Sequence, residues 1–393
     1  MSATEKKAND ETQKQIFDKI ANSDNAELKL LLAQMKGSVD FTDENGMSPL
    51  QHAAYKGNLE VVKTLIDQGA DVNHCEHSSN YTALHFAALS GNAEVCQVLL
   101  LSGAKISTVN SVGRTASQMA AFVNNHNCVA VINNFIPKSD IMYYTTAQGL
   151  QTEPTLLPIL ADPLHKFVMS VNLHPVYLVQ SLQKHAGLME HLNSVRKTIE
   201  MLSEKEMKKG GECNEMMALK FHYLGCIVQE VQKMLDRQSK TPEKKASDIV
   251  ELMAKKLLKT NKEGIPEFQE NFIRECVREF PNRECATFRQ VVMTLAGQES
   301  PPALTVLSGA INGHSAFNDE VTTCFTCGLQ KPAKKCSKCR AVQYCDRECQ
   351  RLHWFMHKKA CARLAQMPAS NTTDKSNVDT VEITQHLKNL MST

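Results

Sequence analysis

Apolar residues in the middle of this chain recur every three or four positions, the spacing that places them along one face of an α-helix. Leu188 to Lys208 shows this pattern most clearly, and Glu215 to Leu235 continues it. Four shorter segments with the same spacing predict further helices: Pro175–His185, Ile249–Leu258, Phe268–Phe280 and Phe288–Leu295. The pattern therefore predicts a helical domain over residues 164–320, with a core of about six helices.

A different pattern, a repeat with a period of 33 or 34 residues, lies near the N-terminus. The segments Ser48–Ala54, Thr82–Ala88 and Thr115–Ala121 align, each beginning with a hydroxyl residue and ending with two alanines. The hydroxyl side chain can cap the first helix of a unit, and Gly69 and Gly103 can end the second helix. A weaker copy precedes these three, as a capping unit at the end of a stack would.

The segments outside these two regions are polar or rich in proline. Residues 1–13 and 366–393 are polar, so we expect both to be disordered. Residues 138–163 contain three prolines, which predicts an extended connector. No stretch approaches the ~18 continuous apolar residues of a membrane span, and the N-terminus lacks an apolar signal core. We therefore expect a cytoplasmic protein without direct membrane insertion.

Composition directs attention to the C-terminal end. The chain has 393 residues, a net charge of +2 and 14 cysteines. In a reducing compartment these thiols are metal ligands or buried side chains rather than disulfides. Residues 324–363 hold seven of the cysteines and carry 10 Lys or Arg against 2 Asp or Glu, a balance of +8.

Eight cysteine and histidine residues in this block have the spacing of zinc ligands. They form the series Cys324-x2-Cys327-x8-Cys336-x2-Cys339-x5-Cys345-x3-Cys349-x7-His357-x3-Cys361. Eight ligands fill two tetrahedral zinc sites without an open position, which predicts structural rather than catalytic metal. Cys345 and Cys349, like His357 and Cys361, are four residues apart, so each pair is expected on one helical face. So small a block needs the metal to fold, and zinc binding should contribute roughly 10 kcal/mol or more of folding free energy per site.

The N-terminal repeats resemble ankyrin repeats, which implies a solenoid over residues 14–137 with three clear repeats and one degenerate cap. Ankyrin arrays are usually binding surfaces, formed by the hairpin tips and by the residues after each alanine pair. The corresponding residues, called the ankyrin surface below, are Met47, Tyr55, Tyr81, Leu89 and Phe122. Apolar side chains facing water are costly without a partner; alternatively, the following helical domain packs on them.

The C-terminal cluster resembles a MYND-type zinc finger over residues 324–361. That resemblance, and not the spacing, implies interleaved pairs. The first zinc would take Cys324, Cys327, Cys345 and Cys349, and the second Cys336, Cys339, His357 and Cys361. The family pattern leaves out His353, which competes on spacing alone.

MYND fingers of transcriptional corepressors bind short proline-containing peptides of PxLxP type. The pocket residues of those relatives match Ser337, Gln350 and Trp354, so the resemblance implies a peptide site there. The face of a tryptophan suits a proline ring; alternatively, Trp354 only packs the small helical core.

The basic residues of the finger raise the alternative of nucleic-acid binding. Seven thiolates and two zinc ions reduce the formal charge from +8 to about +5, so much of the positive charge offsets thiolates. We therefore expect proteins, and not nucleic acid, as partners.

Two further motifs are weak candidates for chemistry. His74-Cys75-Glu76-His77 offers ligand types but has no second pair nearby. Asn125-His126-Asn127-Cys128 is similar to the core motif of SET methyltransferases, but it lies inside a predicted ankyrin helix. Too few residues follow Cys361 to complete a SET domain around the finger.

The order of the three regions makes a mainly α fold: an ankyrin solenoid, a helical middle domain and a double-zinc finger. This order is similar to that of the ankyrin repeat and MYND domain-containing protein 2 family. The runs Val109–Thr115, Asn133–Phe135 and Asn172–Pro175 strengthen the resemblance. It implies a non-enzymatic adaptor, linked to cilia, that brings membrane guanylyl or adenylyl cyclases to the ciliary membrane. The alternative is a nuclear corepressor adaptor that uses the peptide pocket of the finger.

Overall fold

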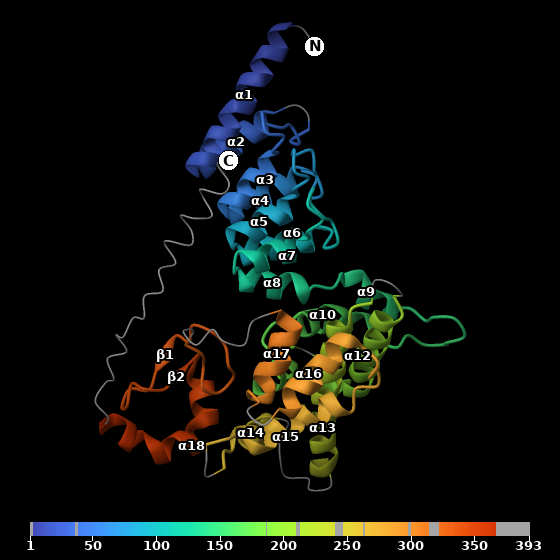
Figure 1. The fold of residues 1–393 in the computed structure, drawn as a ribbon, viewed down its shortest axis with the longest axis vertical. Helices are drawn as coiled ribbons and strands as arrows, with labels where there is room; N and C mark the ends of the chain where they lie inside the picture. The colour runs from blue at the N-terminus through green and yellow to red at the C-terminus, as the bar shows by residue number, and fades with distance from the viewer. Residues whose placement is uncertain are drawn as a thin grey trace.

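A computed structural model describes residues 3–35, 38–185, 187–209, 213–239, 247–261, 264–297, 300–313 and 322–366. Three parts follow one another: a stack of short helices, a larger helical domain and a small C-terminal finger (Figure 1). The mainly α fold class is therefore confirmed.

Four helix pairs form the N-terminal stack: α1 (Ala3–Asn22) with α2 (Asn25–Gln34), α3 (Pro49–Lys56) with α4 (Leu59–Asp67), α5 (Ala83–Ser90) with α6 (Ala93–Leu101), and α7 (Ala116–Phe122) with α8 (His126–Asn133). Ser48 and Thr115 begin α3 and α7 with capping boxes, as their position in the repeat predicts. Gly69 and Gly103 follow α4 and α6 with φ of 88° and 96°, values that a side chain would strain.

The N-terminus differs from the disorder expected over residues 1–13, because α1 already begins at Ala3. Ile16 and Ile20 are fully buried in the ankyrin core and fix the second half of this helix. The preceding sequence is rich in Ala, Glu and Lys, which favour helix, and extending a formed helix is easier than starting one. Anchoring of the second half therefore suffices to extend the first.

Eight helices of the helical domain lie between residues 161 and 312: α10 (Ala161–Val168), α11 (Pro175–Lys184), α12 (Leu192–Met207), α13 (Glu215–Ser239), α14 (Ser247–Leu258), α15 (Glu267–Arg278), α16 (Ala286–Ala296) and α17 (Ala303–Asn312), with a 3-10 turn η3 (Leu188–Glu190) before α12. α13 is the central helix, since it packs against α11, α12 and α14 to α17. Its residues Phe221 and Tyr223 are fully buried.

The predicted connector over residues 138–163 also differs from expectation. It contains α9 (Lys138–Met142) and the 3-10 turns η1 (Tyr143–Thr145) and η2 (Pro158–Leu160). Ile141, Tyr144 and Leu156 are buried in the core of the helical domain. The segment is therefore part of that domain. Its prolines predict an extended connector, but its apolar side chains pack in the core of the helical domain.

Helix α17, which lies beyond the last helix that the sequence predicts, joins the helical domain to the end of the ankyrin stack. It packs against α8. The Asn312 amide donates to the Val171 carbonyl at 3.0 Å, and its Oδ1 accepts from Nδ2 of Asn134 at 2.7 Å. The helical domain thus covers the last repeat.

The finger consists of two short antiparallel strands, β1 (Lys334–Lys335) and β2 (Gln343–Tyr344), followed by α18 (Arg347–Gln366). α18 packs against α14 of the helical domain. The tail expected to be disordered over 366–393 lies outside the described residues, apart from Gln366 at the end of α18.

Candidate functional site

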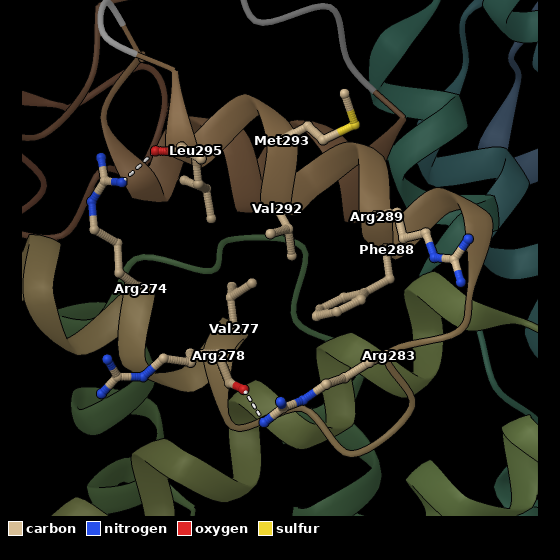
Figure 2. Close-up of a pocket in the computed structure, with 10 residues that line it drawn as sticks. Arg274, Val277, Arg278, Arg283, Phe288, Arg289, Val292, Met293 and Leu295 are labelled. Atoms are coloured by element: carbon tan, nitrogen blue, oxygen red, sulfur yellow. Dashed lines mark hydrogen bonds between the residues drawn. The ribbon is translucent and has the colours of Figure 1, made fainter.

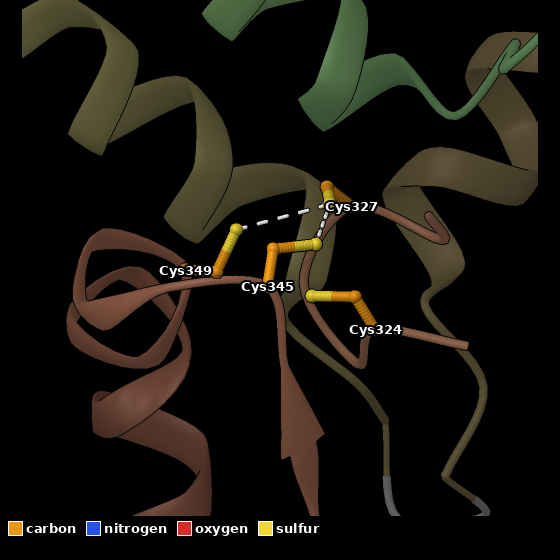
Figure 3. Close-up of side chains that lie close together, drawn as sticks. All are labelled: Cys324, Cys327, Cys345 and Cys349. Atoms are coloured by element: carbon orange, nitrogen blue, oxygen red, sulfur yellow. Dashed lines mark hydrogen bonds between the residues drawn. The ribbon is translucent and has the colours of Figure 1, made fainter. Parts of the chain in front are cut away.

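All eight predicted metal ligands converge into two groups in the finger. Within each group the ligand atoms lie within 4.8 Å of one another. The groups are Cys324, Cys327, Cys345 and Cys349 (Figure 3), and Cys336, Cys339, His357 and Cys361. The pairs interleave along the chain as the MYND resemblance implies, and His353 belongs to neither group.

Turns and backbone hydrogen bonds position the ligand side chains of both groups. Gly328, with φ of 68°, closes a tight turn in which its N–H donates to the Cys324 carbonyl at 2.9 Å. The Cys336 N–H donates to the Val342 carbonyl at 2.9 Å, which holds the second knuckle against β2. His357 and Cys361 share one face of α18, as their spacing predicts.

The matching prediction for Cys345 and Cys349 is wrong. α18 begins at Arg347, so Cys345 lies in the turn before the helix rather than on its face. The Asp346 carboxylate caps this helix by accepting from the Cys349 N–H at 2.8 Å. Cys345 reaches the metal site from the end of β2, which it directly follows, rather than from a helical turn.

The distances within each group fit tetrahedral zinc. A tetrahedron with Zn–S bonds of 2.3 Å places sulfur atoms about 3.8 Å apart. Cys327 Sγ lies 3.5 Å from Cys345 Sγ and 3.8 Å from Cys349 Sγ, and Cys336 Sγ lies 3.8 Å from Cys361 Sγ. Nε2 of His357 lies 3.2 Å from Cys336 Sγ and 3.5 Å from Cys339 Sγ. The finger therefore binds two zinc ions, each with four protein ligands and a structural role.

Neighbouring groups tune the second site. Burial opposes ionisation of Cys336, whereas a hydrogen bond from the backbone N–H of Cys339 lowers the pKa of this thiol. Zinc binds thiolates, so this environment prepares the ligand for metal. The Tyr344 hydroxyl lies 3.0 Å from Nδ1 of His353, so this imidazole makes a hydrogen bond outside the metal site.

The finger is fixed to the helical domain by contacts that the spacing of the zinc ligands does not predict. The Asn172 amide donates to the Cys327 carbonyl at 2.8 Å, so the domain bonds directly to the backbone of a zinc ligand. Leu352 on α18 is 1% exposed and belongs to the core of the helical domain. Arg351 pairs with Glu251 at 2.6 Å. The zinc sites are therefore held in one orientation relative to the rest of the chain.

The three predicted peptide-pocket residues lie next to zinc ligands: Ser337 and Trp354 beside ligands of the second site, and Gln350 directly after Cys349 of the first. Gln350 and Trp354 are one turn apart on α18, and Ser337 directly follows the ligand Cys336. The Trp354 side chain is 43% exposed, and its ring centroid lies 5.9 Å from that of His357. The indole is thus accessible beside a zinc ligand, and its contact with a peptide stays a prediction.

The ankyrin surface divides into exposed and half-buried residues. Tyr55 at the end of α3 is 53% exposed and Phe122 at the end of α7 is 61% exposed. Leu89 between them is half-buried, and Met47 and Tyr81 pack against the ankyrin core. The alternative that the helical domain packs on this row is therefore wrong for Tyr55 and Phe122.

The two weaker motifs gain no support as chemical sites. Within the described residues, His74-Cys75-Glu76-His77 does not bring three candidate ligands together. Asn125 precedes α8, and Cys128 within α8 is fully buried in the ankyrin core, which gives this motif a packing role.

Comparison with known proteins agrees with the three-part fold. A family model for ankyrin repeats in three copies matches residues 17–110, and one for the MYND finger matches residues 324–361. The chain is 30% identical over 376 residues to Dauer abnormal formation protein 25 of Caenorhabditis elegans. This match covers 92% of the chain and 93% of the relative. The chain belongs to the ankyrin repeat and MYND domain-containing protein 2 family.

Membership of this family makes protein interaction the shared property, because both matched modules mediate contacts between proteins. A SET and MYND domain-containing protein of Dictyostelium discoideum is 41% identical over 58 residues, which is 15% of this chain and 10% of the relative. So short a match does not transfer an activity. None of the helices in the described ranges is both long and apolar enough to cross a membrane.

Proposed function

We propose that this chain is a non-enzymatic adaptor that brings membrane guanylyl or adenylyl cyclases to cilia. The observation that supports this most is the presence of two interaction modules, at the two ends of one helical domain, each with exposed aromatic side chains. The ciliary role and the cyclase cargo rest on family membership and the resemblance behind it. The chain would act in the cytoplasm, next to the ciliary membrane.

The finger supplies one of the two binding sites. A proline-containing peptide would add as a short strand beside the finger and place a proline ring on the Trp354 indole, with Ser337 and Gln350 at the sides of the pocket. Zinc contributes indirectly, because His357 both binds the metal and supports the indole. Metal loss should therefore remove peptide binding.

The ankyrin surface supplies the other site. Tyr55 and Phe122 expose aromatic rings, and Arg114 lies 4.8 Å from the Phe122 ring centroid, so the surface combines apolar and cationic contact. Such a combination is typical of the residues that dominate binding energy at interfaces. We assign the cyclase cargo to this surface.

A peptide-binding experiment tests the finger site. We expect Trp354→Ala to weaken binding of a fluorescent PxLxP peptide about tenfold or more, while the chain keeps two zinc ions. Leu329→Ala is the matched control, since Leu329 is an exposed residue (41%) of the same finger outside the proposed pocket. Unchanged affinity in Trp354→Ala with intact zinc would remove this residue from the site.

Proximity labelling in ciliated cells tests the adaptor role. The full chain should label membrane cyclases, and the double variant Tyr55→Glu, Phe122→Glu should lose that labelling while remaining folded. Equal cyclase labelling by both chains would contradict the assignment to the ankyrin surface. Nuclear accumulation of the full chain without cyclase labelling would instead favour the corepressor alternative.

A further inference from the structure

A groove separate from both interaction modules lies between α15 and α16. Its volume is about 580 Å³. Val277, Phe288 and Val292 point into the same space (Figure 2). Val277 and Phe288 are buried, whereas Val292 is 40% and Met293 75% exposed, so the groove has an apolar floor and an open apolar edge. Exposed apolar side chains around a concave surface are a feature of binding sites.

Every charged residue that lines this groove is an arginine: Arg274, Arg278, Arg283 and Arg289. Arg278 and Arg289 pair at 2.5 Å and 2.7 Å with Glu275 and Glu284, which are not among the residues that line the groove. Both arginines are more than 60% exposed, and such exposed pairs contribute little and exchange readily.

Arg283 differs from the other arginines of the groove because it makes no ion pair with any residue in the described part of the chain. Its guanidinium donates to the Arg278 carbonyl at 3.2 Å (Figure 2). This bond uses one of five N–H donors, so most of the guanidinium is available to a carboxylate.

We propose that this groove binds an acidic amphipathic helix of a partner protein. Apolar side chains of the ligand helix would contact Phe288 and Met293, and glutamate or aspartate on its flanks would pair with the arginines. A helix suits the site better than an extended peptide, because both walls are α-helices with no free strand edge for β-addition.

The charge distribution favours a peptide over an anionic membrane. Residues 267–296 carry five glutamates and four arginines, a sum of −1. A bilayer responds to this summed charge within about 8–10 Å, and it would not be attracted. A helix seated in the groove lies nearest the arginines that line it, and among these Arg283 has no ion pair with another described residue, so it can pair with an acidic flank of the helix. This inference does not depend on the cyclase cargo or on the zinc finger.

Binding of a synthetic helix to the full-length chain tests the proposal. The probe is a fluorescent peptide of about four helical turns, with leucine or phenylalanine at every third or fourth position and glutamate on the flanks. A second peptide has lysine at each glutamate position. We expect the acidic peptide to bind the native chain, and Arg283→Glu or Met293→Glu to weaken that binding about tenfold or more.

Two matched controls keep this test specific. Arg237→Glu reverses an exposed arginine on α13, and Val112→Glu changes an exposed residue (72%) of the ankyrin stack; both should bind the acidic peptide like the native chain. Circular dichroism should show that all four variants keep native helix content.

Several results would overturn the proposal. Equal binding of the lysine peptide would show that the arginines do not select the ligand. Displacement of the acidic peptide by phosphatidylserine vesicles would make a lipid surface the occupant. Sedimentation showing a dimer of the native chain that Met293→Glu dissociates would make a second copy of the chain the occupant.

Discussion

Lys220 on α13 provides a sharp test of how the helical domain is stabilised. Its side chain is fully buried, and its Nζ has no hydrogen-bond partner among the described residues. Burial lowers the pKa of this amine from 10.5 to about 7. An ammonium ion without a partner disfavours the folded state, so replacing Lys220 by the similarly sized Met should stabilise the protein.

The size and pH dependence of this effect follow from the pKa difference. A depression of the pKa of Lys220 from 10.5 to about 7 disfavours folding by about 4 kcal/mol at pH 7. Above pH 7 the unfolded chain holds a proton that the folded chain has released, so the unfolding free energy rises with pH. The penalty is complete below pH 7 and disappears as the pH approaches 10.5. The advantage of Lys220→Met should thus shrink by about 2 kcal/mol between pH 7 and pH 9.

Guanidinium denaturation of zinc-loaded protein, followed by circular dichroism at both pH values, measures this difference. Lys233→Met is the control, since Lys233 is an exposed residue of the same helix and its substitution should change little at either pH. Destabilisation by Lys220→Met, or a difference that does not vary with pH, would refute the reasoning. Either result would mean that the Lys220 ammonium is paired in the folded protein.

Two further predictions concern the contacts between the parts. Leu352→Ala leaves a cavity where the finger packs into the core of the helical domain. The variant should lower the unfolding free energy, measured by denaturation, by about 2–5 kcal/mol. An unchanged unfolding free energy would show that the finger is not docked there. Asn312→Ala removes the hydrogen bonds to Asn134 and to the Val171 carbonyl. The free energy of local opening of α8 and α17 should fall by about 1–3 kcal/mol, which amide hydrogen exchange measures as faster exchange in these helices. Unchanged exchange would argue against this junction.

The sequence predicts well those features that depend on local spacing. Ser48 and Thr115 cap helices because the cap needs only a hydroxyl residue and a partner three positions later. The sequence also predicts the eight zinc ligands, because pairs of cysteines separated by two residues and a pair on one helical face are short-range patterns. Their interleaved grouping came from the MYND resemblance, since the spacing left the pairing open.

The features that the sequence did not predict are long-range contacts. Asn134 and Asn312 meet across 178 positions, and Asn172 reaches Cys327 across 155, and no periodicity marks such pairs. Ile141 and Tyr144 become core residues only because the helical domain folds around them. The error for Cys345 has a local cause: four-residue spacing indicates a shared helical face only when both residues lie within the helix, and α18 begins after Cys345.

Native mass spectrometry of the intact chain, titrated with a PxLxP peptide, tests most directly whether zinc builds a docking site. The account predicts one species with two zinc ions and one peptide, and no peptide on the chain after the metal is removed by a chelator. A native chain with fewer than two zinc ions, or equal peptide binding with and without the metal, would contradict it.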